Sequence, residues 1–185
     1  MSSQRKILLI AAAVGIPVVL YLAFVTFGVQ TLFIDDKVNE AGPQFDLAAA
    51  DDATNDVPTD DPAGEASEAS SEVMVLSAGE FVDRSHPAKG VAEVLNDGTE
   101  QRFLRFEDFE VDNGPDLFVY LTTADAAADA SEFGRDGEFV NLGVLKGNIG
   151  SQNYEIPADV DLSEYDTVVI WCRRFAVAFA AADLT

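Results

Sequence analysis

The only cysteine of the 185-residue chain, Cys172, lies beside the only tryptophan, Trp171, in the segment TVVIWCRRFAVAF. Val, Ile, Trp and Phe are enriched in strands, so this segment is predicted to be β-structure. A single cysteine excludes an internal disulfide and any dithiol couple. A two-electron thiol cycle would therefore need a thiol from a partner protein or from a second copy of the chain.

The neighbours of the thiol are compatible with two roles for Cys172. Side chains alternate along a strand, which puts Val168, Ile170, Cys172 and Arg174 on one face. Arg174 would favour a reactive thiolate if both groups were exposed, because a nearby positive charge lowers a thiol pKa. Val168 and Ile170 favour the other role, because cysteine on an apolar face packs as a small, protonated hydrophobe. Core packing is the preferred interpretation, and a redox thiol or cofactor ligand is the alternative.

His86 is the only histidine, which limits the cofactor sites that the chain can build. A blue-copper site takes two histidines and a cysteine, and a Cys₂His₂ zinc site takes two of each, so no metal site of either kind is predicted. Haem stays open, with Cys172 as one axial ligand and His86 or Met74 as the other. Binding would be non-covalent, because the chain has no C-x-x-C-H motif. In its turn-like context before Pro87, His86 is more simply a surface or capping imidazole.

Two polar loops carry the other candidate ligand-binding residues. The segment from Asn113 to Asp116 is most simply a turn. The segment from Lys146 to Gly150 also reads as a turn, and not as a phosphate loop, because extended structure follows it. Polar groups of these loops could bind a ligand, or they could satisfy loop backbone. They belong to Asn113, Asp116, Asn148, Gln152, Asn153 and Tyr154.

Charge and hydropathy predict a membrane anchor at the N-terminus. Residues 1–6 include Arg5 and Lys6, and residues 7–34 follow with 28 positions that carry no charge. About 20 apolar residues in a helix cross a bilayer, so residues 7–34 predict an uncleaved transmembrane helix. The positive-inside rule then places the N-terminus in the cytoplasm and everything after Asp35 outside the cell membrane. The net charge of −22 disfavours nucleic acid as a partner, because an acidic surface repels phosphates.

Residues 35–72 are predicted to be a disordered acidic linker. They carry twelve acidic groups against Lys37, one aromatic residue, Phe45, and no apolar periodicity. Such a segment cannot bury enough apolar surface to offset its ordering entropy. Charge repulsion would keep it extended and hold the following domain away from the membrane.

Residues 73–185 are predicted to form one all-β domain, an antiparallel β-sandwich or barrel, because short alternating runs are separated by turns. The runs GVAEVL and QRFLRF flank Asn96-Asp97-Gly98-Thr99, and an Asp-Gly pair in that position predicts a hairpin. One short helical excursion is predicted at residues 124–133. Strands are expected over residues 74–82, 90–95, 101–106, 109–111, 116–123, 139–146, 153–157, 166–172 and 175–179.

Three groups of residues occur in a distinctive order within this domain: Asn113-Gly114-Pro115-Asp116-Leu117, then Gly147-Asn148 with Gln152-Asn153-Tyr154, then Trp171-Cys172. On these residues, and over roughly residues 74–184, the chain resembles the DM-thirteen domain, an electron-transfer module found beside cytochrome-like DOMON domains. The resemblance implies a β-rich extracytoplasmic domain whose cysteine does redox work as a bare thiol or as a haem ligand.

Two functions of different kinds are therefore predicted. The first is a membrane-anchored redox or electron-transfer module that uses Cys172, with His86, and works with a redox partner protein. The second is a non-catalytic binding or structural module that presents residues 113–116 and 146–154 to a protein, a glycan or a small ligand. A hydrolase is not predicted, since the sequence around the one histidine indicates no Ser-His-Asp set.

Overall fold

A computed structural model describes residues 15–22, 24–25, 34–45, 73–128, 133 and 138–185. Residues 15–22 and 24–25 are helical and carry exposed side chains. Within the described part of the chain, no helix has both the length and the apolar character needed to cross a bilayer. The anchor predicted over residues 7–34 is thus not supported by the structure, and much of that stretch lies outside the described residues.

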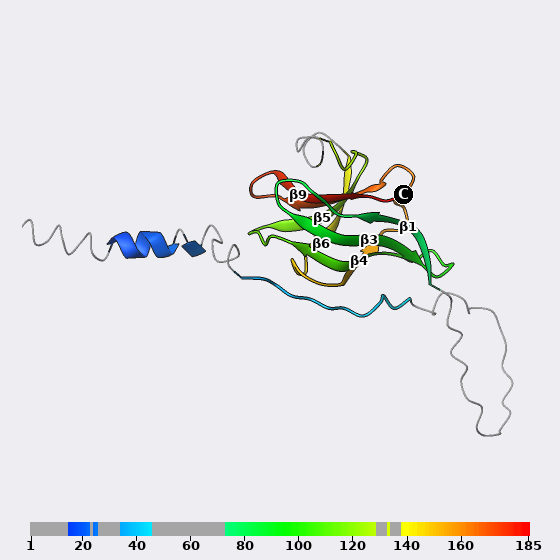
Figure 1. Cartoon of the computed structure of the whole chain (residues 1–185), viewed down its shortest axis with the longest axis horizontal. Helices are drawn as coiled ribbons and strands as arrows, with labels where there is room; N and C mark the ends of the chain where they lie inside the picture. Colours follow the sequence, from blue (N-terminus) through cyan, green and yellow to red (C-terminus); the bar gives the residue numbers. More distant parts are fainter. Residues whose placement is uncertain (1–14, 23, 26–33, 46–72, 129–132, 134–137) are drawn as a thin grey trace, which may run out of the picture.

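Two antiparallel sheets packed face to face form the domain, as Figure 1 shows. In the described residues, one sheet has the strand order β1-β3-β4-β7 and the other β2-β9-β8-β5-β6. This arrangement confirms the all-β prediction and selects the sandwich. The strands are β1 (Met74–Glu80), β2 (Val82–Asp83), β3 (Ala88–Asn96), β4 (Arg102–Val111), β5 (Leu117–Thr122), β6 (Phe139–Val144), β7 (Gln152–Ile156), β8 (Thr167–Cys172) and β9 (Val177–Asp183).

The predicted hairpin joins β3 to β4. Asn96 pairs with Arg102, and the loop between them turns at Gly98, which has a φ of 88°. The side chain of Asn96 accepts a hydrogen bond from the Gly98 N–H at 2.8 Å and donates to the carbonyl of Gln101 at 2.7 Å. A left-handed glycine and an Asx turn therefore set the register of the two central strands of this sheet.

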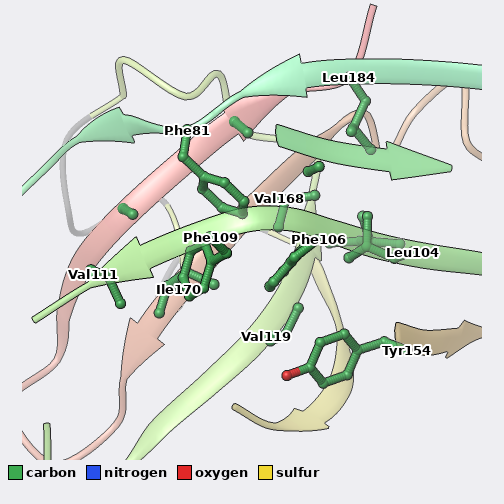
Figure 2. Close-up of a cluster of buried hydrophobic side chains, with 14 of the residues drawn as sticks. Phe81, Leu104, Phe106, Phe109, Val111, Val119, Tyr154, Val168, Ile170 and Leu184 are labelled. Carbon is green, nitrogen blue, oxygen red and sulfur yellow. The ribbon is translucent and has the colours of Figure 1, made fainter. Parts of the chain in front are cut away.

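Apolar side chains from both sheets fill the space between them (Figure 2). Phe81, Phe106 and Phe109 form the aromatic centre, with ring centroids 4.7 to 5.0 Å apart. Val168 and Ile170 of β8 face these rings from the second sheet and are fully buried. The alternation of β8 therefore directs its even-numbered side chains into the core.

The outer face of the five-stranded sheet is covered as well. Val169 and Trp171 of β8 belong to a second buried cluster with Ala126 and Phe133, which come from the connection between β5 and β6. This explains why β5 and β8 are buried along their whole length. The helical excursion predicted at residues 124–133 falls largely outside the described residues, although Phe133 is helical and residues 126 and 127 are in a turn.

The first part of the predicted linker is docked on the domain. Residues 34–45, here called the strap, run extended along one side of the sandwich and appear in cyan in Figure 1. Lys37 bridges Ile149 in parallel, the Val38 N–H donates to the Ile149 carbonyl at 2.9 Å, and the Glu40 N–H donates to the Ser151 carbonyl at 2.8 Å. The prediction of a disordered linker is therefore wrong for residues 35–45, because their backbone finds partners on the domain. Residues 46–72 lie outside the described residues.

Candidate functional site

Cys172 is fully buried at the end of β8. Its backbone pairs with Leu117 of β5 and Val177 of β9, and its side chain belongs to the main core cluster. Burial is the largest influence on the thiol and raises its pKa, whereas hydrogen bonds from the backbone of Phe175 and Arg174 act in the opposite direction and are too weak to reverse it. A protonated thiol without solvent access is a poor nucleophile.

Arg174 does not share a strand face with Cys172, contrary to the sequence prediction. The strand ends at Cys172, and residues 173–176 form a turn in which Ala176 has a φ of 51°. Arg174 therefore acts on the sulfur mainly through its backbone and is exposed. The alternation expected for a continuous strand does not hold beyond Cys172, because the chain reverses there to enter β9.

His86 lies near the same end of the sheet as Cys172. Its backbone N–H donates to the Phe179 carbonyl at 3.3 Å, and its ring stacks on the Phe179 ring with centroids 3.9 Å apart. Nδ1 lies 3.0 Å from a carboxylate oxygen of Asp112. The imidazole thus ties the segment after β2 to the end of β4, which matches the capping role more closely than a ligand role.

The three residues considered for haem do not fit that group. Cys172 is sealed in the core, and His86 is held between Phe179 and Asp112. Met74 is the first residue of β1, and Ala78 of the same strand pairs with Thr185, which follows β9. Thr185 lies near Thr167, at the start of β8, whereas Cys172 is at the end of β8. Met74 is therefore at the opposite end of the sandwich from Cys172. No pair of these side chains can hold one iron from both sides in this fold.

Gln152 and Tyr154 support the loop from Lys146 to Gly150. The Gln152 amide nitrogen donates to the Gly147 carbonyl at 2.9 Å, and its amide oxygen accepts from the Gly147 N–H at 3.2 Å. The Tyr154 hydroxyl donates to the same amide oxygen at 2.7 Å and accepts from the Lys146 N–H at 3.0 Å. Burial raises the pKa of Tyr154. These two side chains satisfy loop backbone and present no free polar group to a ligand.

Asn113, Asp116 and Asn148 meet around one cleft. Its volume is about 190 Å³, and Asp36 of the strap forms part of its wall. The Asn148 amide donates to the Val111 carbonyl at 2.8 Å and to a carboxylate oxygen of Asp35 at 3.1 Å, while its oxygen accepts from the Asp36 N–H at 2.7 Å. The structure therefore brings the two predicted loops together, and the strap already contacts both.

The strap also uses residues that the sequence analysis did not select. Both carboxylate oxygens of Glu40 lie within 2.9 Å of Lys146 Nζ, and one accepts from the Asn153 N–H at 2.8 Å. Burial by itself would raise the pKa of Glu40, but the hydrogen bonds from Lys146 and Asn153 outweigh it and lower the pKa. Arg105, which is 9% exposed, donates to the Ala41 carbonyl at 3.0 Å and to the Asn153 side chain at 2.8 Å.

One signal of the strap was present in the sequence. Phe45 is the only aromatic residue between residues 35 and 72, and aromatic side chains gain the most from burial. In the structure its ring packs edge-on against Phe103 of β4, with centroids 5.1 Å apart. Sequence periodicity missed the remaining contacts because they involve backbone groups and single polar pairs.

Comparison with protein families matches residues 80–184 to the family described as Electron transfer DM13. These 105 of the 185 positions make up more than half of the chain and include His86, both polar loops and Cys172. The strap and Met74 lie before the matched range. No curated protein and no solved structure matched the chain.

Proposed function

Because the chain belongs to the electron transfer DM13 family, we propose that it serves an electron-transfer system as a binding module that carries no redox centre of its own. The observation that supports this form of the proposal is the complete burial of Cys172, together with the raised pKa of its thiol. A thiol that exchanges electrons by disulfide chemistry must be reached by a partner sulfur. Electron transfer itself is then performed by the partner that the domain binds.

The partner is proposed to be a protein. The cleft formed by the two predicted loops holds about 190 Å³ and is partly walled by the strap, whereas pockets for small ligands usually hold about 300–1,000 Å³. Asn148 and Gln152 are almost fully buried and already bonded within the chain. A redox protein that docks on the exposed surface of the sandwich fits these constraints better than a small ligand in the loops.

The module is further proposed to be tethered to the cell membrane, with the β domain on the outer side. Two features support this: the uncharged run over residues 7–34, and Arg5 and Lys6 before it. In the described helical residues, the apolar side chains of Val19 and Leu20 are both 64% exposed. A lipid bilayer around this helix would remove these apolar side chains from water.

Thiol labelling of the full chain in mild detergent tests the buried-cysteine proposal. We expect Cys172 to react with a maleimide at least about 100-fold more slowly in the native protein than in urea, because reaction requires opening of the core. A Glu100→Cys variant supplies the control, since Glu100 is exposed in the β3–β4 loop and a cysteine there is expected to label rapidly. Native labelling of Cys172 as fast as at position 100 would refute the proposal.

A further inference from the structure

Residues 146–153, with Arg105 and Asn113, form a continuous surface that the strap occupies, here called the strap groove. The contacts follow the strap from one end to the other. The Asn113 amide donates to the Ile34 carbonyl at 2.8 Å, Asn148 holds Asp35 and Asp36, and Asn153 donates to the Ala41 carbonyl at 2.8 Å. Backbone bonds to Ile149 and Ser151 lie between these side-chain contacts.

Two glycines leave room for the strap backbone. A Cβ atom on Gly150 would lie 1.8 Å from the Val38 carbonyl oxygen, and one on Gly147 would lie 2.6 Å from the Asp36 carbonyl oxygen. Gly150 also has a φ of 108°, a conformation that other residues rarely adopt. Any side chain at these two positions would prevent the strap from approaching. The groove is therefore shaped for a peptide backbone at close range.

Charge selects an acidic occupant. Lys146 is one of only eleven Lys and Arg residues in a chain of net charge −22, and its ammonium faces the strap. Arg105 is paired with Glu107 of the domain and donates to the backbone of the strap at Ala41. Glu40 meets Lys146, and Asp35 and Asp36 meet the amides of Asn148 and Asn113. Because charge-assisted hydrogen bonds are stronger than neutral ones, carboxylates at these positions add both affinity and register.

From these contacts we propose that the strap groove is a binding site for an extended acidic peptide, and that residues 34–45 of the same chain are its resident ligand. The peptide adds in parallel beside residues 148–151 by backbone hydrogen bonds, a form of recognition in which the main chain provides affinity and the side chains provide specificity. On this proposal, the strap remains bound to the domain even when the chain is cut within residues 46–72.

If the proposed membrane anchor is correct, the docked strap also fixes the position of the domain relative to the membrane. Phe45 packs on Phe103 and β1 starts at Met74, so the described residues on both sides of residues 46–72 lie on the domain. Ile34, the last residue of the uncharged run, contacts Asn113. The strap, and not residues 46–72, therefore sets how far the domain stands from the membrane.

Cleavage of the full chain at one engineered position tests the groove. A tobacco etch virus protease site is placed within residues 46–72, and an affinity tag precedes Met1. After complete cleavage in mild detergent, the fragment that contains residues 73–185 is expected to stay on the affinity resin with the tagged fragment. Its full release into the wash, with the domain still folded by circular dichroism, would overturn the proposal.

Two proline variants of the strap provide a matched pair. Val38→Pro removes the N–H that donates to Ile149, whereas Asn39→Pro changes the next residue, whose N–H points away from Ile149 because bonding directions alternate along a strand. We expect Val38→Pro to lower retention at least about tenfold, and Asn39→Pro to lower it much less. Equal retention of the two variants would contradict the proposed backbone pairing. Both substitutions lie outside the fragment of residues 73–185, and circular dichroism of each variant checks that this fragment is folded.

The same cleaved protein shows which of the two proposals is wrong, the peptide-binding groove or the membrane anchor. If the groove is wrong, the domain fragment is released while the tagged fragment stays with membranes. If the anchor is wrong, both fragments leave the membranes at high pH and still elute together from the resin. The detergent experiment reads out the groove alone, because it needs no membrane.

Discussion

At the scale of single residues, the position of Cys172 determines what the domain can do chemically. Val168, Ile170 and Cys172 were expected on one apolar face from the alternation of the segment, and all three are fully buried. Arg174 could not be placed correctly, because residues 173–176 contain no Gly, Pro, Asn or Asp to indicate the turn. A turn that depends on a positive φ at an alanine gives no signal in the composition.

Removing the sulfur should cost stability. Cys172→Ala removes the buried sulfur, which is also the acceptor of the Phe175 and Arg174 backbone hydrogen bonds, so we expect the free energy of unfolding to fall by about 1–2 kcal/mol. Urea denaturation of the full chain measures it. Glu155→Ala, at an exposed position of β7, should change stability by less than about 0.5 kcal/mol. Equal effects for the two variants would contradict a packing role for the sulfur.

Gln152 is the second residue whose role is structural in this account. Gln152→Met keeps the length of the side chain but leaves the backbone groups of Gly147 and the hydroxyl of Tyr154 without their partner. We expect a loss of roughly 1–3 kcal/mol in the free energy of unfolding, again measured in urea. Gln44→Met in the exposed part of the strap serves as the comparison. An unchanged stability for Gln152→Met would argue that this amide is available to a ligand.

At the scale of elements, most strands were predictable and the strap was not. The strand expected over residues 74–82 is divided into β1 and β2 at Phe81, and the two strands expected over residues 101–106 and 109–111 are the single strand β4. Hydrophobic alternation and the Asp-Gly loop locate β3 and β4, because burial on one sheet face imposes a period of two. Continuous runs of β-branched and aromatic residues locate β5 and β8, which are buried on both faces. The strap follows no such period. Its order comes from pairing with Ile149 and Ser151, which are distant in sequence, and from the missing side chains of two glycines.

Docking of the strap should weaken in acid. The pKa of Glu40 is lowered from its ordinary value of 4.5 in the docked state, so its contribution is complete above that value and is lost as the pH falls through the docked pKa. Retention of the cleaved domain fragment should therefore be lower at about pH 3 than at pH 7.

A Glu40→Gln variant identifies the titrating group. The variant strap should bind the domain more weakly at pH 7. Retention of the domain fragment should also fall less on acidification than it does with the parent strap. Some pH dependence is expected to persist, because Glu107 contacts Arg105 of the groove and, against the effect of burial, hydrogen bonds from Arg105 and Ser151 likewise lower its pKa. An identical pH profile for parent and variant would show that Glu40 does not control docking.

At the scale of the whole molecule, the docked strap gives the domain a defined orientation on the proposed anchor. Ile34 contacts Asn113, so the end of the sandwich that carries Asn113 and Val144 should face the lipid surface. The β3–β4 loop with Glu100 lies at the other end of the ten-residue strand β4, about 30 Å away.

Spin labels can test this orientation in vesicles. A label at Val144→Cys, a position that is 60% exposed, should be relaxed strongly by a paramagnetic lipid headgroup, and a label at Glu100→Cys should be relaxed only weakly. The native cysteine should not interfere, because Cys172 is buried. Equal relaxation at both positions would mean that the domain is not held at the membrane by one end, and the Val38→Pro variant is expected to show that behaviour.

The central claim is that this member of an electron-transfer family carries no redox centre of its own, and a reductive titration tests it most directly. The full chain, purified from its own host in detergent, is titrated with dithionite while its absorbance spectrum is recorded. We predict no electron uptake per chain and no change in the visible spectrum. A reproducible uptake of one or two electrons would contradict the account, and its disappearance in the Cys172→Ala variant would assign the redox centre to the sulfur.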